Sequence, residues 1–315
     1  MPASDETDGQ VTGHRHAMID TLQTKFGIPG SVAVTAGNNG LPRVTLSHRS
    51  GASAEIYLHG AHVTSWRNAK GEELFFLSRS SNWAADKPIR GGIPVCFPQF
   101  SNHGPLPLHG FARISEWTLA QTERLGSGEV VAAFQLSDSD ATQALWPHRF
   151  TFELRVTLAE TALTIAVQVK NNGDKPFDFE LALHTYFGVG EIQRTAVCGL
   201  EGVTFSDSLR NNIQEVETRQ EIRFDQETDR IYINTPDCVR IRDEARNRVI
   251  AVQKSGMADA VVWNPWIAKS QRMPDFGDDE YLRMVCVETG NMASRLNLAP
   301  HSQWHGSTVL SVLPA

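Results

Sequence analysis

Residues 150–169 read FTFELRVTLAETALTIAVQV, and this stretch decides the fold class. Large apolar side chains occupy every second position, from Phe150 to Leu158 and again from Leu163 to Val169. A period of two is typical of strands that bury one face. The segment Ala159-Glu160-Thr161 separates the two runs. The stretch therefore predicts an antiparallel hairpin.

The alternation resumes after residues 171–176, NNGDKP, which are rich in turn-forming residue types. From Phe177 to Leu183 every second side chain is apolar. Successive strand residues point to opposite faces, so the second face takes the residues between them. These are Asp178, Glu180, Ala182, His184 and Tyr186. The pattern predicts a strand that presents His184 away from its apolar side.

A shorter alternation lies near the C-terminus. Val285 and Val287 take one face of a short predicted strand, which leaves Met284, Cys286 and Glu288 on the other face. Many short strands with little helical periodicity favour an all-β fold of mostly antiparallel strands.

We expect one β domain over residues 17–315, preceded by a disordered tail over the polar residues 1–16. The domain begins with a short predicted helix, because Ile19, Leu22 and Phe26 recur at helical spacing before Gly27.

Charge and cysteine content narrow the classes of partner. The net charge of −7 provides no general field for nucleic acid or an anionic membrane, so an anion must be bound by a local cluster. No stretch approaches the roughly 20 apolar residues of a membrane span, and no targeting segment is evident. The 4 cysteines are far apart, which argues against a local zinc or redox motif. We expect a cytoplasmic monomer with reduced cysteines.

Two arginines and a histidine lie in loop-forming sequence. Arg90 precedes Gly91-Gly92-Ile93-Pro94, and His109 and Arg113 belong to the segment 109-HGFAR-113. Arginine binds phosphate and carboxylate oxygens with a forked guanidinium, so the combination indicates an anionic substrate with proton transfer nearby. The alternative is that each arginine is a surface ion-pair partner and that His109 is an ordinary loop residue.

His184 and Glu288 are the candidate acid–base pair. Both are predicted on strands that end in turn-forming sequence, and one can donate a proton while the other accepts one. The alternative is that each is a half-exposed sheet residue. His59 and His62 lack a carboxylate or cysteine at ligand spacing, so we interpret them as packing residues and predict no metal site.

Residues 261–267 place Trp263 and Trp266 around an Asn-Pro turn, where the rings either stack on a sugar or fill the core. Asp229 lies in a polar turn that leads into a strand. The sequence contains no Walker A loop, dinucleotide fingerprint, nucleophile elbow or H-E-x-x-H motif, so it gives no support to the chemistries of those motifs.

Six segments in order carry a family resemblance. They are 87-KPIRGGIP-94, 109-HGFAR-113, 183-LHTYF-187, 227-ETD-229, 261-VVWNPW-266 and 287-VETG-290. Together they closely resemble the glucose-6-phosphate 1-epimerases, the hexose-6-phosphate mutarotase branch of the aldose 1-epimerase superfamily. The resemblance covers about residues 30 to 312. It implies a β-supersandwich of the galactose mutarotase-like fold, with a site that needs neither cofactor nor metal.

The resemblance also implies roles for single residues. His184 and Glu288 match the catalytic histidine and glutamate of the family, and Arg90, Arg113 and Asp229 match substrate-binding positions. His109 matches a motif histidine near the reacting centre. Leu108 departs from the polar residue that family members often carry there, which puts the fine sugar specificity in question.

The implied activity is interconversion of the α and β anomers of a hexose 6-phosphate, with glucose 6-phosphate as the expected small-molecule partner. Glu288 would take the proton of the C1 hydroxyl, His184 would protonate the ring oxygen, and Arg90 and Arg113 would hold the phosphate. Three alternatives remain open at this point: a mutarotase for unphosphorylated aldoses, a non-catalytic carbohydrate-binding or sensor protein, and a polysaccharide-processing domain.

Overall fold

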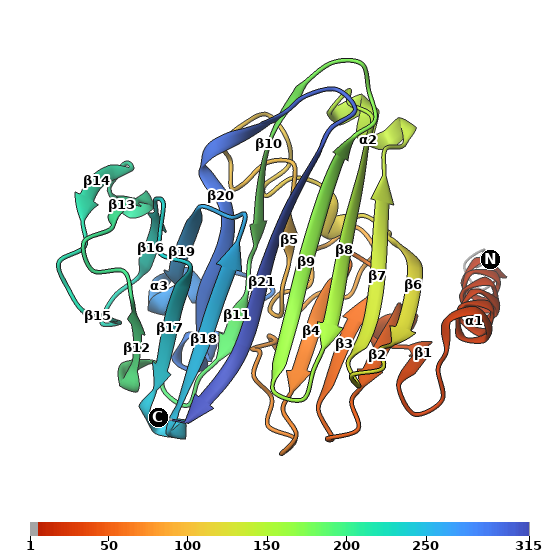
Figure 1. Cartoon of the computed structure of the whole chain (residues 1–315), viewed down its shortest axis with the longest axis horizontal. Helices are drawn as coiled ribbons and strands as arrows, with labels where there is room; N and C mark the ends of the chain where they lie inside the picture. The colour runs from red at the N-terminus through yellow and green to blue at the C-terminus, as the bar shows by residue number, and fades with distance from the viewer. Residues whose placement is uncertain (1–5, 315) are drawn as a thin grey trace, which may run out of the picture.

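The computed structural model describes residues 6–314, and within them the side chains of residues 15–313. Three antiparallel sheets, of 4, 8 and 9 strands, make up most of the described chain. Figure 1 shows α1 (Glu6–Phe26) beside β1 at one end of the molecule, and the small strands β13 and β14 at the other end. Short helices α2 (Asp140–Leu145) and α3 (Trp266–Ser270) lie in connections between strands.

The strand orders are as follows. The 4-stranded sheet consists of β1 (Val32–Ala36), β2 (Pro42–Ser47), β3 (Ser53–Tyr57) and β4 (His62–Arg67). The 9-stranded sheet runs β15 (Glu221–Arg223), β12 (Thr195–Cys198), β17 (Cys238–Asp243), β18 (Arg248–Ser255), β21 (Gln303–Pro314), β9 (Ala162–Asn171), β8 (Phe150–Leu158), β7 (Val130–Ser137) and β6 (Thr118–Arg124).

The 8-stranded sheet carries the candidate catalytic residues. It runs β14 (Ile213–Val216), β13 (Thr204–Asp207), β16 (Thr228–Tyr232), β19 (Asp259–Asn264), β20 (Met284–Leu298), β10 (Phe177–Leu183) and β5 (Val95–Cys96), and β11 (Tyr186–Gly188) pairs with β20 beside β10.

The predicted hairpin is confirmed as β8 and β9. The two strands pair antiparallel from Phe150 and Asn171 to Leu158 and Leu163. Every second side chain is buried along β8, as the alternation requires. The inward side chains join a large apolar core with residues of the other two sheets.

The two faces predicted for the central strands are also confirmed. Val285 and Val287 of β20 belong to the large core, whereas Met284 and Cys286 belong to a second apolar cluster on the opposite face. Both faces are buried, because loops cover the second one. β20 is longer than the predicted short strand: it has 15 residues and continues through Gly290 along β10, with a register shift between Phe179 and Leu181 of the partner strand.

The N-terminal helix is longer than the sequence predicted. Ile19 and Phe26 are buried as expected, but α1 already begins at Glu6 within the predicted tail. Once a docked turn has nucleated a helix, each added residue contributes one hydrogen bond, so a helix can continue past the last apolar contact. Residues 1–5 of the predicted tail lie outside the described residues.

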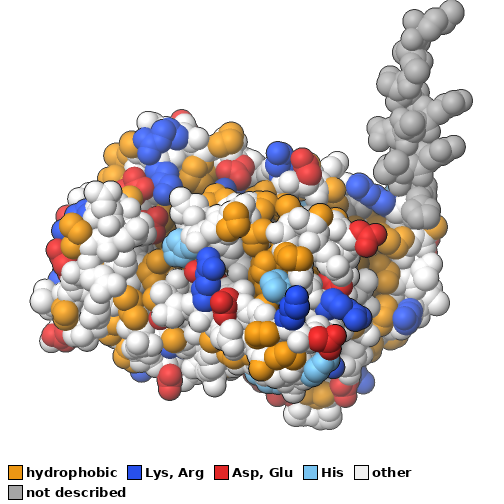
Figure 2. All heavy atoms as spheres, turned by 90° about the horizontal axis from the view of Figure 1, so that it is seen from above, with side chains coloured by type: hydrophobic (Ala, Val, Ile, Leu, Met, Phe, Trp, Pro, Cys, Tyr) orange, Lys and Arg blue, Asp and Glu red, His pale blue; other side chains and the backbone are white. Residues whose placement is uncertain are grey.

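The surface seen in Figure 2 intersperses acidic and basic side chains without a large patch of one sign. No helix within residues 6–314 is both long and apolar enough to span a bilayer. All 4 cysteines are unpaired in the structure, as expected.

Candidate active site

A cavity of about 260 Å³ lies on the loop-covered face of the 8-stranded sheet, where Tyr186, Ile231 and Trp263 of its strands line it. Its complete lining is Arg90, Phe100, Ser101, His103, Leu108, His109, His184, Tyr186, Ser208, Asp229, Ile231, Trp263, Lys269, Met273 and Glu288. Of the six site residues predicted from the sequence, five line this cavity and Arg113 does not.

His184 and Glu288 face each other within the cavity. Neighbouring strands hold them, because Leu183 pairs with Thr289 and Tyr186 pairs with Cys286. His184 Nε2 lies 3.4 Å from Glu288 Oε1. Both side chains are buried, so the interpretation as half-exposed sheet residues is wrong. His184 Nδ1 and Glu288 Oε2 are buried and have no hydrogen-bond partner in the protein.

Burial favours the neutral form of both groups. It raises the pKa of Glu288 well above the usual value, with a further increase from Asp229, whereas the positive charge of Arg113 lowers it. Burial also lowers the pKa of His184 well below the usual value, and Arg90 and Arg113 add to this effect. The site therefore disfavours charge on either member, a pattern that is common at acid–base sites.

Arg90 reaches the cavity from the loop before β5. Its guanidinium donates through Nε and Nη2 to Asp275 Oδ2 at 3.1 and 3.0 Å, and through Nη1 to the Tyr186 hydroxyl at 3.0 Å. Burial alone would lower the pKa of Arg90, but Tyr186 and Asp275 outweigh it and raise the pKa. The Tyr186 ring in turn stacks on His184, with centroids 4.8 Å apart. Arg90 is thus held in place at the edge of the cavity and keeps its positive charge.

Backbone packing sets the position of Arg90. Gly91 and Gly92 have φ of 114° and 58°, and a Cβ on either would lie within 2.4 Å of a neighbouring backbone oxygen. His59 Nε2 donates to the Lys87 carbonyl, 2.7 Å away, because a carbonyl oxygen can only accept. His62 makes the same bond to Gly91 at 2.6 Å. The interpretation of both histidines as packing residues is confirmed.

His109 and Arg113 come from the same loop and the short helix after it, η2 (Ala112–Ile114). The His109 ring packs edge-on against His184, 5.4 Å between centroids, and its Nδ1 accepts from the Ser101 backbone N–H at 3.2 Å. Arg113 is buried, and Nη2 donates to the Leu108 carbonyl at 2.7 Å. Arg113 is not among the residues that line the cavity, so its expected contact with substrate stays a prediction.

Asp229 of β16 and Lys269 of α3 also line the cavity. Lys269 Nζ lies 3.8 Å from Asp229 Oδ2 and 5.7 Å from the centre of the Trp263 ring. Burial raises the pKa of Asp229, although Lys269 lowers it. Trp263 lines the cavity, whereas Trp266 packs against the core.

Three functional candidates were missed from the sequence: Asp275, Tyr186 and Lys269. Tyr186 shares a predicted strand face with His184, and that signal was available. Asp275 lies in a turn far along the chain from Arg90, and Lys269 lies in α3 far from Asp229, so nothing in their local sequence indicates these contacts. Within the described residues, no cluster of three or more His, Cys, Asp or Glu side chains has the arrangement of a metal site.

One protein-family model, described as "Aldose 1-epimerase", matches residues 42–311. The chain belongs to the aldose 1-epimerase family. As a member of this family it is an isomerase, and the predicted family and enzyme class are confirmed.

Curated relatives of this aldose 1-epimerase family member share most of its length. A protein of Cenchrus ciliaris named "Putative glucose-6-phosphate 1-epimerase" is 39% identical over 284 residues, which cover 88% of this chain and 86% of the relative. A protein of Escherichia coli K12 with the same name is 40% identical over 241 residues, 75% and 79% of the two chains.

Solved structures confirm the fold of this family member. A protein from Salmonella typhimurium described as a "putative mutarotase (YeaD)" superposes with a TM-score of 0.84 at 30% identity, over 95% of this chain and all of that chain. A galactose mutarotase-like protein from Clostridium acetobutylicum gives a TM-score of 0.72 at 16% identity over 90% and 98%, and therefore supports the fold alone. The predicted β-sandwich of galactose mutarotase-like fold is confirmed.

Proposed function

We propose that the chain interconverts the α and β anomers of hexose 6-phosphates, with glucose 6-phosphate as the main substrate. The observation that carries this proposal is the buried contact between His184 and Glu288, each with one unpartnered polar atom. In a cyclic sugar, the ring oxygen and the C1 hydroxyl are bonded to the same carbon. Two groups 3.4 Å apart can therefore reach both oxygens of one substrate.

In this proposal Glu288 removes the proton of the C1 hydroxyl while His184 gives a proton to the ring oxygen. The C1–O5 bond breaks as the C1–O1 bond becomes a carbonyl, and the open aldehyde forms. After rotation about C1–C2, His184 takes the proton back as the ring oxygen attacks C1, and Glu288 reprotonates O1. The enzyme ends in its starting protonation state, so no co-reactant is consumed.

Burial opposes the charged forms that these roles require, but the charge of Arg113 acts in favour of one of them. Glu288 must be ionised to act as a base, and the charge of Arg113 favours that form by lowering its pKa. We propose this function for Arg113. His109 packs on His184 and we propose that it orients the imidazole.

The phosphate needs cations that face the cavity. Arg90 and Lys269 are the Lys and Arg residues that line it, and Lys269 is one-third exposed. Charge-assisted hydrogen bonds to phosphate are roughly twice as strong as neutral ones, so these two side chains are suited to discriminate a 6-phosphate from a free hexose. We propose that Asp229 accepts hydrogen bonds from sugar hydroxyls.

The test follows the optical rotation of freshly dissolved α-glucose 6-phosphate and of free α-glucose, with and without protein. The proposal expects acceleration of the phosphate reaction, and loss of about 10²- to 10⁴-fold of it in His184→Asn and Glu288→Gln. Glu123→Gln, an exposed residue of β6, serves as the matched control. Acceleration of free glucose alone would reassign the substrate, and no acceleration of either would leave a binding role.

A further inference from the structure

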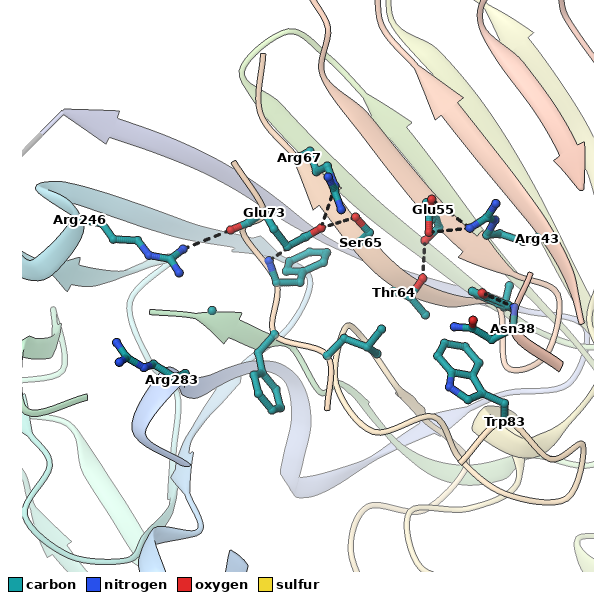
Figure 3. Close-up of a pocket in the computed structure, with 15 residues that line it drawn as sticks. Asn38, Arg43, Glu55, Thr64, Ser65, Arg67, Glu73, Trp83, Arg246 and Arg283 are labelled. Carbon is teal, nitrogen blue, oxygen red and sulfur yellow. Dashed lines mark hydrogen bonds and ion pairs between the residues drawn. The ribbon is translucent and has the colours of Figure 1, made fainter. Parts of the chain in front are cut away.

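A second cavity, of about 400 Å³, shares no lining residue with the candidate active site. It lies between the outer face of β2–β4, the segment 73–77 and the turns that precede β18 and β20 (Figure 3). We call it the arginine pocket. Its charged lining residues are Arg43, Arg67, Arg246, Arg283, Glu55 and Glu73.

The two glutamates are already occupied. Glu55 pairs with Arg43 at 3.2 Å. Glu73 Oε1 accepts from the backbone N–H groups of Trp66, Leu74 and Phe75 at 3.0–3.2 Å, and Oε2 accepts from the Ser65 hydroxyl and from Arg67. With five donors around it, the carboxylate of Glu73 has no capacity left for a further guanidinium.

Arg246 and Arg283 keep their positive charges uncompensated. In the described part of the chain, the guanidinium of Arg246 donates only to the Glu73 carbonyl, at 3.4 Å, and that of Arg283 donates only to the Gly190 carbonyl. Among the residues that the structure describes, neither guanidinium lies within 4.0 Å of a carboxylate. The pocket therefore carries excess positive charge on a chain whose net charge is −7.

The turns that carry these two arginines are fixed to each other. The buried Asp243 accepts from the backbone N–H of Gly190 at 3.2 Å and from that of Arg246 at 3.3 Å. The Arg283 carbonyl accepts from the Val189 N–H at 2.9 Å. Because residues 189–190 link both turns, the backbone positions from which the two arginines extend are fixed relative to each other before any ligand arrives, which lowers the entropic cost of binding.

The other end of the pocket has different chemistry. Figure 3 shows Asn38, Thr64 and Trp83 gathered away from Arg246 and Arg283, with Glu73 and Arg67 between the two ends. Trp83 is half-buried and packs on Tyr57, with ring centroids 4.9 Å apart. An amide, a hydroxyl and an indole are groups that recognise a hydroxylated or planar ring.

We propose that the arginine pocket is a second ligand site for a small organic phosphate, whose phosphate group binds Arg246 and Arg283 and whose ring lies toward Asn38 and Trp83. The site stands apart from the proposed catalysis, because it contains none of the residues of the catalytic cavity. Segment 73–77 lies between the two sites: Phe76 lines the arginine pocket and its N–H donates to the Tyr186 carbonyl at 3.0 Å.

The test counts bound ligand by equilibrium dialysis with radiolabelled glucose 6-phosphate as the probe. The parent is compared with the double variant Arg246→Gln/Arg283→Gln and with Arg124→Gln/Arg240→Gln. The control pair removes the same charge from exposed strand positions outside both cavities. Circular dichroism verifies that each variant is folded, which we expect because all four side chains are exposed.

We expect the Arg246/Arg283 variant to bind one equivalent less than the parent, and the control pair to bind as many as the parent. Inorganic phosphate should displace that equivalent, and free glucose should not. Equal stoichiometry in parent and Arg246/Arg283 variant would overturn the proposal. The difference of one equivalent is expected whether or not the catalytic cavity binds the probe, so failure of the proposed function gives a separate result.

Discussion

Glu288→Gln should make the protein inactive and more stable at the same time. Burial raises the pKa of Glu288, so above the unfolded-state value near 4.5 the fold must either hold a proton there or bury a charge. Glu288 Oε2 also lacks a partner. Glutamine keeps the shape and removes the charge. Each unit by which the folded protein raises the pKa of a carboxyl corresponds to about 1.4 kcal/mol of stability lost above that pKa, and we expect a gain of at least this order at pH 8.

The sign of the pH dependence follows from the raised pKa. Below about pH 4.5 the carboxyl is protonated in both folded and unfolded chains, so charge makes no difference between parent and variant there. As the pH rises above that value, the parent loses stability relative to Glu288→Gln. The measurement is the melting temperature of both proteins from pH 5 to pH 8, where the expected gain corresponds to a few degrees.

Glu280 provides the matched control. It is also buried, but its carboxylate accepts from Ser78 Oγ at 2.6 Å, Gly277 N–H at 2.8 Å and Arg79 N–H at 2.9 Å. Burial opposes its ionisation, but these bonds outweigh burial and lower its pKa. Glu280→Gln should therefore destabilise the protein at pH 8, by about 1.5–3 kcal/mol for each charged hydrogen bond lost.

The reasoning fails if Glu288→Gln melts below the parent at pH 8, or if the difference between them is the same at pH 5. If Glu288→Gln keeps nearly the turnover of the parent, Glu288 is not the base, whatever its effect on stability. Glu288→Asp, which keeps the charge and withdraws it by one methylene, should lose activity without the gain in stability.

Three further outcomes are expected. Asp275→Ala should raise the KM for the hexose phosphate about tenfold or more, because Arg90 loses two of its three side-chain bonds; an unchanged KM would show that Arg90 needs no support. Arg113→Met should move the acidic limb of the kcat/KM profile to higher pH, because Arg113 lowers the pKa of Glu288; an unmoved limb would separate the two groups. Burial opposes ionisation of Glu217, but bonds from Arg219 and Tyr232 lower its pKa to about 2, so its stabilising contribution is present above pH 4.5 and lost toward pH 2. Melting curves of Glu217→Gln and the parent should therefore converge over that interval, and parallel curves would contradict this.

Alternation of apolar residues was sufficient to predict the hairpin of β8 and β9 and the antiparallel all-β class, but not the three sheets or their strand orders. It placed Glu288 opposite to Val287, as in β20, and His184 opposite to Leu183, although His184 lies in the break between β10 and β11 and not within a strand. Side-chain direction in a strand is fixed by period, so such predictions need no knowledge of distant residues. The motifs of the family supplied what period cannot, namely that these two faces meet in one cavity.

The surroundings of the site were not predictable by the same means. Arg90 and Asp275 are 185 positions apart, and only the tertiary fold brings them together. Arg113 shows a similar limit: a guanidinium in a loop motif suggests an anion, but nothing in the motif indicates the hydrogen bond from Arg113 to the Leu108 carbonyl. Residue type indicates what a side chain can bind, and the fold decides which partner it meets.

The reacting pair and the groups around it are held by different kinds of structure. His184 and Glu288 sit where two hydrogen-bonded strands run side by side, with paired residues on both flanks. Arg90, His109, Lys269 and Asp275 all come from loops or a single helical turn. Loops accept substitution and insertion far more readily than central strands, whose slip by one residue would turn Glu288 into the core. Substitutions in these loops, in evolution or in design, can therefore change which sugar is recognised and leave the ring-opening pair unchanged.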